Sequence, residues 1–486
     1  MRNSILRPIL YPFTLLTAIS SFGAQPVKKN VLFIAVDDLR TELGCYGIDQ
    51  IKTPNIDRLA RQGVVFNRAY CQQAVSSPTR TSLLTGLRPD VTKIYDLETH
   101  FRTTIPDVIT LPQYFKSQGY YTTSFGKIYH AGLDDPLSWT EKLKVPGYSM
   151  YALPANKELV ASKKKAQAGK TSANAVAQYN ALLGPAYESA DVPDNTYGDG
   201  VITDCAISLL KEQRMKESPF FLAVGFFKPH LPFVAPKKYW DLYDGDKIDM
   251  AKNPFPPENV PKIALTEWTE LRAYEDISQL GPLTEGQARK LKQGYYACVS
   301  YTDAQIGRLL DELDRQGLTE NTIIILWGDH GWKLGEHGMW SKHTNFEDDT
   351  HAPLICSFPG QKTKGSHANG LVEFVDIYPS LCELAGLPLP SHLQGKSFVP
   401  LLESPNLPGK EAAFSQFPRG KKIMGYSMRT DRYRYTEWVD TSNKKVTAHE
   451  LYDHQVDPLE NKNVADAAEN AGLVKELAGK LGKYMR

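Results

Sequence analysis

The sequence has almost no excess charge of either sign. Its 56 Lys and Arg residues are balanced by 55 Asp and Glu residues, which leaves a formal net charge of +1. A protein that binds nucleic acid or an acidic membrane by charge alone needs a field of one sign over a broad surface. The composition therefore argues against a basic nucleic-acid-binding protein and against a membrane-surface protein held by charge.

Glycine and proline are also scarce. The chain has 35 Gly and 32 Pro in 486 residues, about 14%, which is well below the roughly 25 to 30% typical of disordered or low-complexity chains. A folded globular protein is expected. At roughly 100 to 200 residues per domain, the length predicts two to four domains, or one large α/β domain with a smaller one.

Long hydrophobic runs are absent except at the N-terminus. There Arg2 and Arg7 precede an apolar run over residues 9–19, and small residues follow over 20–24. This pattern predicts a secretory signal peptide over residues 1–24, and Pro8 and Pro12 argue against the alternative of a buried helix. No Cys follows the small residues, so a lipid anchor is not expected. We expect an exported protein, periplasmic or secreted, without a membrane anchor.

Cysteine motifs are missing as well. The six cysteines are widely spaced, without a CxxC pair or His partners at zinc-site distances, which argues against a zinc ribbon or a thioredoxin-type motif. Three disulfides would be possible in an exported protein, but most of these residues have apolar neighbours and are interpreted as small buried hydrophobic side chains. They are Cys45, Cys71, Cys205, Cys298, Cys356 and Cys382.

The sequence does contain continuous apolar runs that end in polar residues. Such runs are typical of strands covered on both faces of a sheet. Strands are predicted at 30–36, 120–125, 220–227, 322–327 and 353–358. A helix is predicted from Thr53 to Gly63, and a second over 288–316, where apolar residues recur at spacings of three and four before Gly317.

Strands that alternate with helices predict an α/β fold with a large, doubly wound, mainly parallel sheet, which binds ligands beyond the carboxyl ends of its strands. Proline density rises over 390–408, and alternating runs at 423–430 and 433–439 predict antiparallel strands. We therefore predict a catalytic domain over 25–403 and a C-terminal α+β subdomain over 404–486.

The most informative motif begins at Ser76. The segment Ser76-Ser77-Pro78-Thr79-Arg80 is followed by Leu83-Leu84-Thr85-Gly86. On residues alone it could be a helix start capped by Ser77. The order Ser, any residue, Pro, any residue, Arg, with Thr-Gly after four more residues, resembles the signature of the sulfatase family, in which the first residue becomes formylglycine.

The resemblance implies a chemistry that serine cannot perform. A serine that attacked a sulfate ester would keep a stable sulfate ester. The hydrated aldehyde carries two hydroxyls on one carbon, so one can attack sulfur, and the other can expel sulfate by breaking the carbon–oxygen bond. The family also implies a divalent cation, Ca²⁺, with Mg²⁺ or Mn²⁺ left open. Its predicted ligands are Asp37, Asp38, Ser76, Asp329 and His330.

The resemblance extends to further residues. Arg80 lies one helical turn after Ser76, and Gly126-Lys127-Ile128-Tyr129-His130 matches the Gly-Lys-x-x-His pattern of the family. It implies that Arg80 and Lys127 hold the sulfate oxygens and that His130 accepts a proton. His230 and Lys342 resemble the pair that contacts the bridging oxygen on the leaving-group side, although a packed histidine and a solvated lysine are the alternatives.

Several blocks resemble one branch of the family, whose members remove 2-O-sulfate from terminal uronic acids of glycosaminoglycans such as heparan and chondroitin sulfate. Ser76 replaces the cysteine expected in that branch, which implies a bacterial enzyme matured by a sulfatase-maturing enzyme, or an engineered Cys-to-Ser change. Arg102, Lys342 and Arg419 are candidates for binding the uronate carboxylate. The blocks are 37–40, 43–47, 72–75, 88–90, 95–96, 112–115, 329–338, 340, 345–346, 415–419 and 425–430.

Two other functions stay open. A phosphomonoester or phosphonate hydrolase of the alkaline phosphatase superfamily would share the fold and one metal site, and a second Asp and His cluster for zinc would favour it. A non-catalytic protein that binds sulfated glycans with an unmodified Ser76 is the other alternative.

Overall fold

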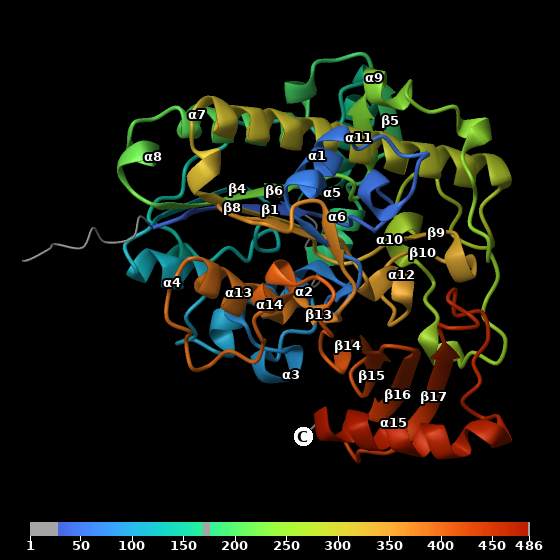
Figure 1. Ribbon diagram of the computed structural model, residues 1–486. Helices are drawn as coiled ribbons and strands as arrows, with labels where there is room; N and C mark the ends of the chain where they lie inside the picture. Colours follow the sequence, from blue (N-terminus) through green and yellow to red (C-terminus); the bar gives the residue numbers. More distant parts are fainter. Residues whose placement is uncertain (1–27, 169–174, 485–486) are drawn as a thin grey trace, which may run out of the picture.

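The protein is described here from a computed structural model, which describes residues 28–168 and 175–484 (Figure 1). The predicted signal peptide over residues 1–24 lies outside this part of the chain. The centre of the fold is a seven-stranded sheet with the order β12-β2-β11-β8-β1-β6-β4. Its strands are β1 (Asn30–Val36), β2 (Val64–Phe66), β4 (Tyr121–Gly126), β6 (Phe220–Phe226), β8 (Thr322–Gly328), β11 (Leu354–Ser357) and β12 (Ser366–Ala368).

The sheet is mainly parallel, as predicted. Strand β1 pairs in parallel with β6 and β8, and β4 pairs in parallel with β6. Strand β11 runs antiparallel to both β8 and β2. Its apolar run predicts a buried strand but carries no information about direction. The four parallel neighbours bring the residues after β1, β4, β6 and β8 to one edge.

Each face of the sheet has its own hydrophobic core, because successive side chains of a strand point to opposite faces. Leu32, Ile34 and Val36 pack into one core, and Val31 and Phe33 pack into the other. Two sets of helices cover the sheet, one on each side (Figure 1). The first set is α1 (Pro54–Gln62), α7 (Gly198–Leu210) and α11 (Glu285–Arg315); the second is α2 (Ser76–Thr85), α4 (Leu111–Ser117), α13 (Ile377–Leu384) and α14 (Val399–Glu403).

The longest helix, α11, matches the prediction closely. Thr284 and Gln287 form a capping box at its start, which satisfies backbone donors that would otherwise lack partners. Its buried stripe includes Leu291, Tyr295 and Cys298. Buried Asp303 accepts hydrogen bonds from the amides of Asn55 (3.0 Å) and Ile56 (2.7 Å), so α11 also caps the start of α1.

A four-stranded antiparallel sheet forms the C-terminal part of the protein, and α15 (Ala471–Tyr484) packs on it (Figure 1). The predicted boundary at residue 404 falls between α14 and β14 and stays a prediction. The structure adds two strands to the two that were predicted. The sheet consists of β14 (Ala412–Arg419), β15 (Ile423–Thr430), β16 (Tyr433–Asp440) and β17 (Val446–Asp453).

A buried ion-pair network joins the C-terminal sheet to the main domain. Arg434 pairs with Glu347 and with Glu460 (2.6 Å), and Glu460 accepts from His454 (2.8 Å). Asn345 donates to the carbonyl of Gly425 (3.0 Å). The segment around residues 340–347 is therefore held by the C-terminal sheet.

The remaining strands and helices are short, except for α5, which has 14 residues. They are β3 (Ala69–Tyr70), β5 (Tyr187–Ala190), β7 (Phe233–Pro236), β9 (Lys333–Leu334), β10 (Trp340–Ser341), β13 (Val372–Glu373), α3 (Pro89–Thr92), α5 (Pro154–Gln167), α6 (Ala175–Asn180), α8 (Arg214–Glu217), α9 (Lys237–Trp240), α10 (Thr269–Arg272) and α12 (Glu347–Thr350).

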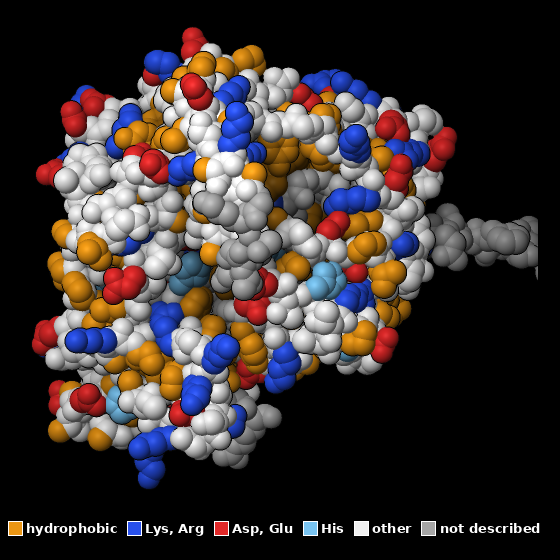
Figure 2. All heavy atoms as spheres, turned by 180° about the vertical axis from the view of Figure 1, so that it is seen from behind, with side chains coloured by type: hydrophobic (Ala, Val, Ile, Leu, Met, Phe, Trp, Pro, Cys, Tyr) orange, Lys and Arg blue, Asp and Glu red, His pale blue; other side chains and the backbone are white. Residues whose placement is uncertain are grey.

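The surface and the cysteines agree with the composition. On the face shown in Figure 2, acidic and basic side chains are interspersed. All six cysteines are free, and Cys71, Cys298, Cys356 and Cys382 are buried. Across residues 28–168 and 175–484, none of the helices has the length and apolar character needed to cross a bilayer.

Candidate active site

Three carboxylates meet where β1 and β8 end. Val36 pairs with Gly328 in the parallel register, so Asp37 and Asp38 follow one strand beside Asp329 and His330 on the other. The amide of Asp38 donates to Oδ1 of Asp329 (3.0 Å). All four residues are buried, with at most 1% of their surface exposed. Carboxylates brought together in this way repel one another unless cations compensate them.

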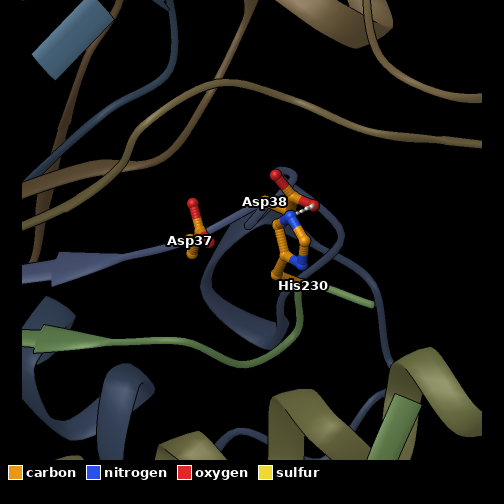
Figure 3. A group of neighbouring side chains, drawn as sticks. All are labelled: Asp37, Asp38 and His230. Atoms are coloured by element: carbon orange, nitrogen blue, oxygen red, sulfur yellow. Dashed lines mark ion pairs between the residues drawn. The ribbon is translucent and has the colours of Figure 1, made fainter. Parts of the chain in front are cut away.

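The donor atoms of this cluster fit a divalent cation. The ligand atoms of Asp37, Asp38 and His230 lie within 4.8 Å of one another, and so do those of Asp38, Asp329 and His330. Figure 3 shows Asp37 and Asp38 at the end of β1, with His230 approaching Asp38 from the loop after β6. Oxygen-rich sites of this kind suit hard cations such as Ca²⁺ and Mg²⁺.

His330 adds an independent indication. Its Nδ1 lies 2.9 Å from the carbonyl oxygen of Gly331, so Nδ1 carries the proton. Its Nε2 is buried without a hydrogen-bond partner among the residues that the structure describes, and it lies 3.4 Å from Oδ1 of Asp38 and 3.7 Å from Oδ1 of Asp329. A lone pair that faces two carboxylates is unfavourable unless a cation lies between them. His330 therefore fits as a metal ligand.

Ser76 is the first residue of α2. Val75 is extended and forms the N-cap, so the helix starts at Ser76 rather than being capped by Ser77. The hydroxyl of Ser76, which is 2% exposed, donates to Oδ1 of Asp37 (3.0 Å). Because α2 begins here, its unpaired amides and dipole favour negative charge beside Ser76.

Arg80 lies one turn further along α2 and is fully buried. Its guanidinium donates to Oδ1 of Asp37 (3.1 Å) and to Oδ2 of Asp329 (2.9 Å). It also donates to the carbonyl of Ile128 (3.1 Å). Arg80 thus ties the ends of β1, β8 and β4 to the start of α2.

Lys127 reaches the cluster from the end of β4. Its amine pairs with Asp37 and lies 3.4 Å from the hydroxyl oxygen of Ser76. The chain can approach this closely because Gly126 has a positive φ of 73° and a Cβ atom there would lie 2.0 Å from the carbonyl oxygen of Gly225. A Cβ at Gly225 would in turn lie 2.1 Å from the carbonyl oxygen of Lys127. Two glycines therefore bring β4 and β6 together beneath Lys127.

His230 and Lys342 form the other side of the cluster. The amine of Lys342 donates to Oδ1 (3.0 Å) and Oδ2 (3.1 Å) of Asp38. Nε2 of His230 lies 3.9 Å from Oδ2 of Asp38, and its Nδ1 lies 2.6 Å from the carbonyl oxygen of Leu231. The structure thus places both residues beside Asp38.

Glu270 completes this side and was not predicted from the sequence. Its Oε1 accepts from Lys342 (2.8 Å) and from Nε2 of His230 (3.0 Å), while its Oε2 is buried without a partner in the described chain. It lies on α10, a single turn in a stretch of loops between α9 and α11. No motif or spacing pointed to it, and only the folded chain brings it to His230.

The two histidines of the site have opposite electrostatic surroundings. Burial, together with Lys127 and Arg80, lowers the pKa of His130 to about 3, so His130 is neutral. Burial also acts to lower the pKa of His230, but Asp38, Asp37 and Glu270 outweigh it and raise the pKa overall. Both nitrogens of His230 face acceptor oxygens, which agrees with a protonated ring. Two histidines whose pKa values are shifted in opposite directions can serve one as a base and the other as an acid.

The carboxylates differ as well. Burial acts to raise the pKa of Asp37, but Lys127, His230 and Arg80 hold it well below its usual range. The pKa of Asp38 is raised because burial and Asp37 outweigh Lys342 and His230. Lys342 keeps its charge, since Asp38 and Glu270 raise its pKa despite burial.

Two arginines predicted to bind the uronate carboxylate have different partners in the structure. Arg102 pairs with Asp135 (2.9 Å) and donates to Gln113 (2.8 Å), so it braces a loop, and its role in binding substrate stays a prediction. Arg419 stacks on Phe417 and Trp438 and donates only to backbone carbonyls of the described chain, such as that of Ile263 (2.8 Å). Phe417 contacts His343, the neighbour of Lys342.

The sheet, the buried carboxylates at its edge and the serine at the start of α2 define a sulfatase-type site, and the comparisons agree. The family model described as Sulfatase matches residues 29–387, and that of the C-terminal region of N-sulphoglucosamine sulphohydrolase matches residues 335–486. The chain belongs to the sulfatase family, as its motifs predicted, and is a sulfuric ester hydrolase.

Individual proteins of known sequence or structure are also similar to it. It is 38% identical to iduronate 2-sulfatase of Mus musculus, over 92% of this chain and 93% of that protein. Its fold resembles that of a protein solved in complex with its substrate D-glucosamine-2-N,6-O-disulfate (TM-score 0.74, 24% identity, 94% of this chain and 97% of that chain). It also resembles a phosphonate monoester hydrolase of Agrobacterium radiobacter (TM-score 0.72, 25% identity, 94% and 95%).

Proposed function

We propose that the protein is an exo-acting sulfatase that removes a 2-O-sulfate from a uronic acid, saturated or unsaturated, at the end of a glycosaminoglycan fragment. Ser76 is its nucleophile after oxidation to formylglycine by a sulfatase-maturing enzyme. The single observation that carries the proposal is the position of the Ser76 hydroxyl, 3.0 Å from Asp37 and beside the amine of Lys127. The likeness to iduronate 2-sulfatase supports the choice of sugar.

One divalent cation, proposed to be Ca²⁺, fits between Asp37, Asp38, Asp329 and His330, with the modified Ser76 as a further ligand. When bound, it would polarise the sulfate and lower the pKa of the attacking hydroxyl. The site residues Arg80 and Lys127 hold fixed positive charge at the end of the cluster nearest Ser76. They are suited to bind the sulfate oxygens as charge develops on them.

His130 is the proposed base. It is neutral because its pKa is lowered to about 3, and its buried Nδ1 has no hydrogen-bond partner within the described residues. It can therefore accept a proton from the second hydroxyl of the hydrated residue 76 when sulfate leaves. That transfer breaks the carbon–oxygen bond and regenerates the aldehyde.

His230 and Lys342 are the proposed leaving-group residues. A sugar alkoxide is a poor leaving group, so the bridging oxygen must gain a proton as its bond to sulfur breaks. His230 carries an N–H on Nε2 that points to Glu270 in this arrangement. We propose that this proton passes to the bridging oxygen, while Lys342 stabilises the developing charge.

The uronate carboxylate needs a cation that is not already paired with protein carboxylates. Arg419 meets this requirement, because the acceptors it has in the described chain are backbone carbonyls. Burial lowers its pKa to about 10, so it remains charged at neutral pH. We propose Arg419 as the residue that binds the uronate, with Phe417 beneath it.

The proposal is tested with matured enzyme and a panel of defined disaccharides sulfated at 2-O, 4-O, 6-O or N, with an aryl sulfate and an aryl phosphonate beside them. Release of sulfate from the 2-O position is expected to exceed all other sugar positions. Release only from 6-O or N positions would overturn the sugar assignment. Hydrolysis of the phosphonate alone would favour the second candidate, a phosphonate hydrolase, which the likeness to the Agrobacterium radiobacter enzyme supports.

The predicted export to the periplasm or the medium is part of the same proposal. Glycosaminoglycan fragments are too large and too charged to be met inside a cell unless they are imported. A processed N-terminus near residue 24 in the exported protein is the expected sign. Retention of the intact N-terminus in the cytoplasm would contradict it.

A further inference from the structure

We infer that Asp199 and Lys228 are positioning residues that fix the imidazole of His230 against the leaving group. The inference rests on the proposed role of His230. Within the described residues, neither side chain forms a hydrogen bond with Ser76, Arg80 or Lys127, and neither residue belongs to a motif assigned to the chemistry. Both act on the loop over residues 227–232, which carries His230 outside any strand.

Asp199 holds the start of this loop. It is the second residue of α7, is 1% exposed, and directs its carboxylate at the exit of β6. Its Oδ1 accepts from the amide of Phe227 (2.8 Å), and its Oδ2 accepts from the amide of Lys228 (2.8 Å). The two oxygens of one carboxylate therefore satisfy two successive amides that no longer pair with a strand. Charged acceptors make stronger and shorter hydrogen bonds than neutral ones.

Lys228 holds the far end of the same loop. Its amine donates to the carbonyl of His230 (2.8 Å) and to that of Pro232 (2.6 Å). The residue is 9% exposed, and it forms no ion pair with a carboxylate in the described part of the chain. Buried lysines normally pair with a carboxylate because an unpaired ammonium is costly to bury. Here the charge is used instead to bind two carbonyls on either side of Leu231.

The loop is also held from behind. The hydroxyl of Thr302, on α11, donates to the carbonyl of Lys228 (3.1 Å). Two amides and one carbonyl in the first half of the loop and two carbonyls in its second half are thus bound by three different side chains. Because Nδ1 of His230 is fixed to Leu231 within the same loop, any shift of the loop moves Nε2 directly.

A displacement of Nε2 should affect one step of the reaction more than the others. A misplacement of about 1 Å can cost on the order of 100-fold in rate. The cost falls on protonation of the bridging oxygen, which a sugar leaving group requires and a good aryl leaving group does not. Loss of the positioning residues should therefore depend on the substrate, whereas a general loss of structure should not.

The experiment compares D199A, K228M and H230A with the unchanged enzyme on a 2-O-sulfated disaccharide and on 4-nitrophenyl sulfate. We expect D199A and K228M to lose roughly 100-fold in kcat on the disaccharide and less than about threefold on the aryl ester. H230A should show the same preference in stronger form. D199N, which keeps the volume and one acceptor oxygen, should lie between D199A and the unchanged enzyme.

Asp303 provides a matched control, because it is also a buried Asp that accepts from two backbone amides, those of Asn55 and Ile56. D303A should change both substrates by the same factor. The informative case is one in which H230A loses more activity on the disaccharide than on the aryl ester. In that case, equal losses on the two substrates in D199A and K228M, or no loss on either, would overturn the inference. If H230A itself shows no preference between the substrates, the proposed role of His230 fails and the inference fails with it.

Discussion

The two sides of the active site are built differently. The side around Ser76 consists of residues at the ends of β1, β4 and β8 and at the start of α2, and Asp37, Ser76 and Arg80 are at most 2% exposed. The side around His230 consists of residues on loops and on the single turn of α10. The side chains of His230 and Glu270 are 23% and 20% exposed, whereas that of Lys342 is 4% exposed. In the proposed mechanism, the side built on the sheet binds the sulfate group that all substrates share, and the loops face the part of the substrate that varies.

The difference shows how such a fold can change its substrate without losing its reaction. Strand ends are held by the sheet ladder and by two cores, so Asp37 and Asp329 cannot move independently. The loop that carries His230 depends on a few side chains instead, namely Asp199, Lys228 and Thr302. Substitutions on the first side should therefore affect all substrates, and those on the second side should affect selected ones.

The largest expected effect is on the Ser76 side. Removing divalent cations with a chelator should abolish turnover of every sulfate ester, because Asp37, Asp38 and Asp329 would then be left as three neighbouring buried carboxylates. Sulfate release is measured before and after chelation, and again after Ca²⁺, Mg²⁺ or Mn²⁺ is returned. Full activity in a preparation shown by elemental analysis to be free of metal would contradict the metal assignment.

A smaller and selective effect is expected for His230→Ala. General acid catalysis typically contributes on the order of 100-fold to 10,000-fold, so the loss on a sulfated disaccharide should fall in this range. The loss on 4-nitrophenyl sulfate should be much smaller. Asp329→Ala is the matched comparison from the other side of the site and should reduce both substrates alike. If His230→Ala also reduces both alike, the division of the site into two sides is wrong.

Glu270→Gln should have a weaker effect of the same kind. The carboxylate binds both His230 (3.0 Å) and Lys342 (2.8 Å), and the amide keeps the shape but loses the charge. Hydrogen bonds to charged groups are worth roughly 1.5 to 3 kcal/mol, which predicts a loss of roughly 10-fold to 150-fold on the disaccharide. The change should appear in kcat rather than KM. An unchanged kcat on the disaccharide would show that Glu270 is only structural.

The smallest effect on turnover is expected for Glu450→Gln, in the C-terminal sheet. Burial raises the pKa of Glu450 to about 7, although Trp438 and Tyr452 donate to it. The folded protein therefore binds a proton that the unfolded chain releases at a lower pH. The stability contributed by this proton is present below the unfolded pKa and is lost as pH rises through about 7.

The free energies of unfolding of the unchanged protein and of the Glu450→Gln variant should therefore differ by an amount that depends on pH. Between about pH 5 and pH 8, the unchanged protein should lose up to about 3 kcal/mol of unfolding free energy that the Gln variant keeps. Urea unfolding at both pH values measures the difference, and other groups titrate alike in both proteins. A difference that does not change with pH would show that Glu450 is ionised throughout.

Much of the fold could be predicted because its signals are local. The apolar runs that became β1, β6 and β8 stop where polar residues begin, and α11 carries a clear repeat of apolar side chains. The direction of β11 could not be predicted, since pairing with β8 and β2 depends on how the chain returns to the sheet. An apolar run in the sequence predicts that a strand is buried. Whether the strand pairs parallel or antiparallel depends on the strands beside it.

The site residues also divide into those with a local sequence signal and those that depend on a distant contact. Asp37, Asp329 and Ser76 could be proposed because they follow strands or lie in a motif, and the structure brings them together. Glu270 could not, because its role depends on a contact with His230 across 40 residues of chain. Arg102 could be named only as a candidate cation for the uronate, because the sequence does not show that Asp135 pairs with it in the fold.

The central claim is that Ser76 is converted to formylglycine, and a mass spectrum of the tryptic peptide over residues 69–80 tests it most directly. The protein is taken from its native setting or produced together with a serine-type sulfatase-maturing enzyme, and its sulfatase activity is measured on the same sample. A peptide lighter by two hydrogen atoms is expected, in proportion to activity. An active sample whose peptide contains only unmodified serine would contradict it.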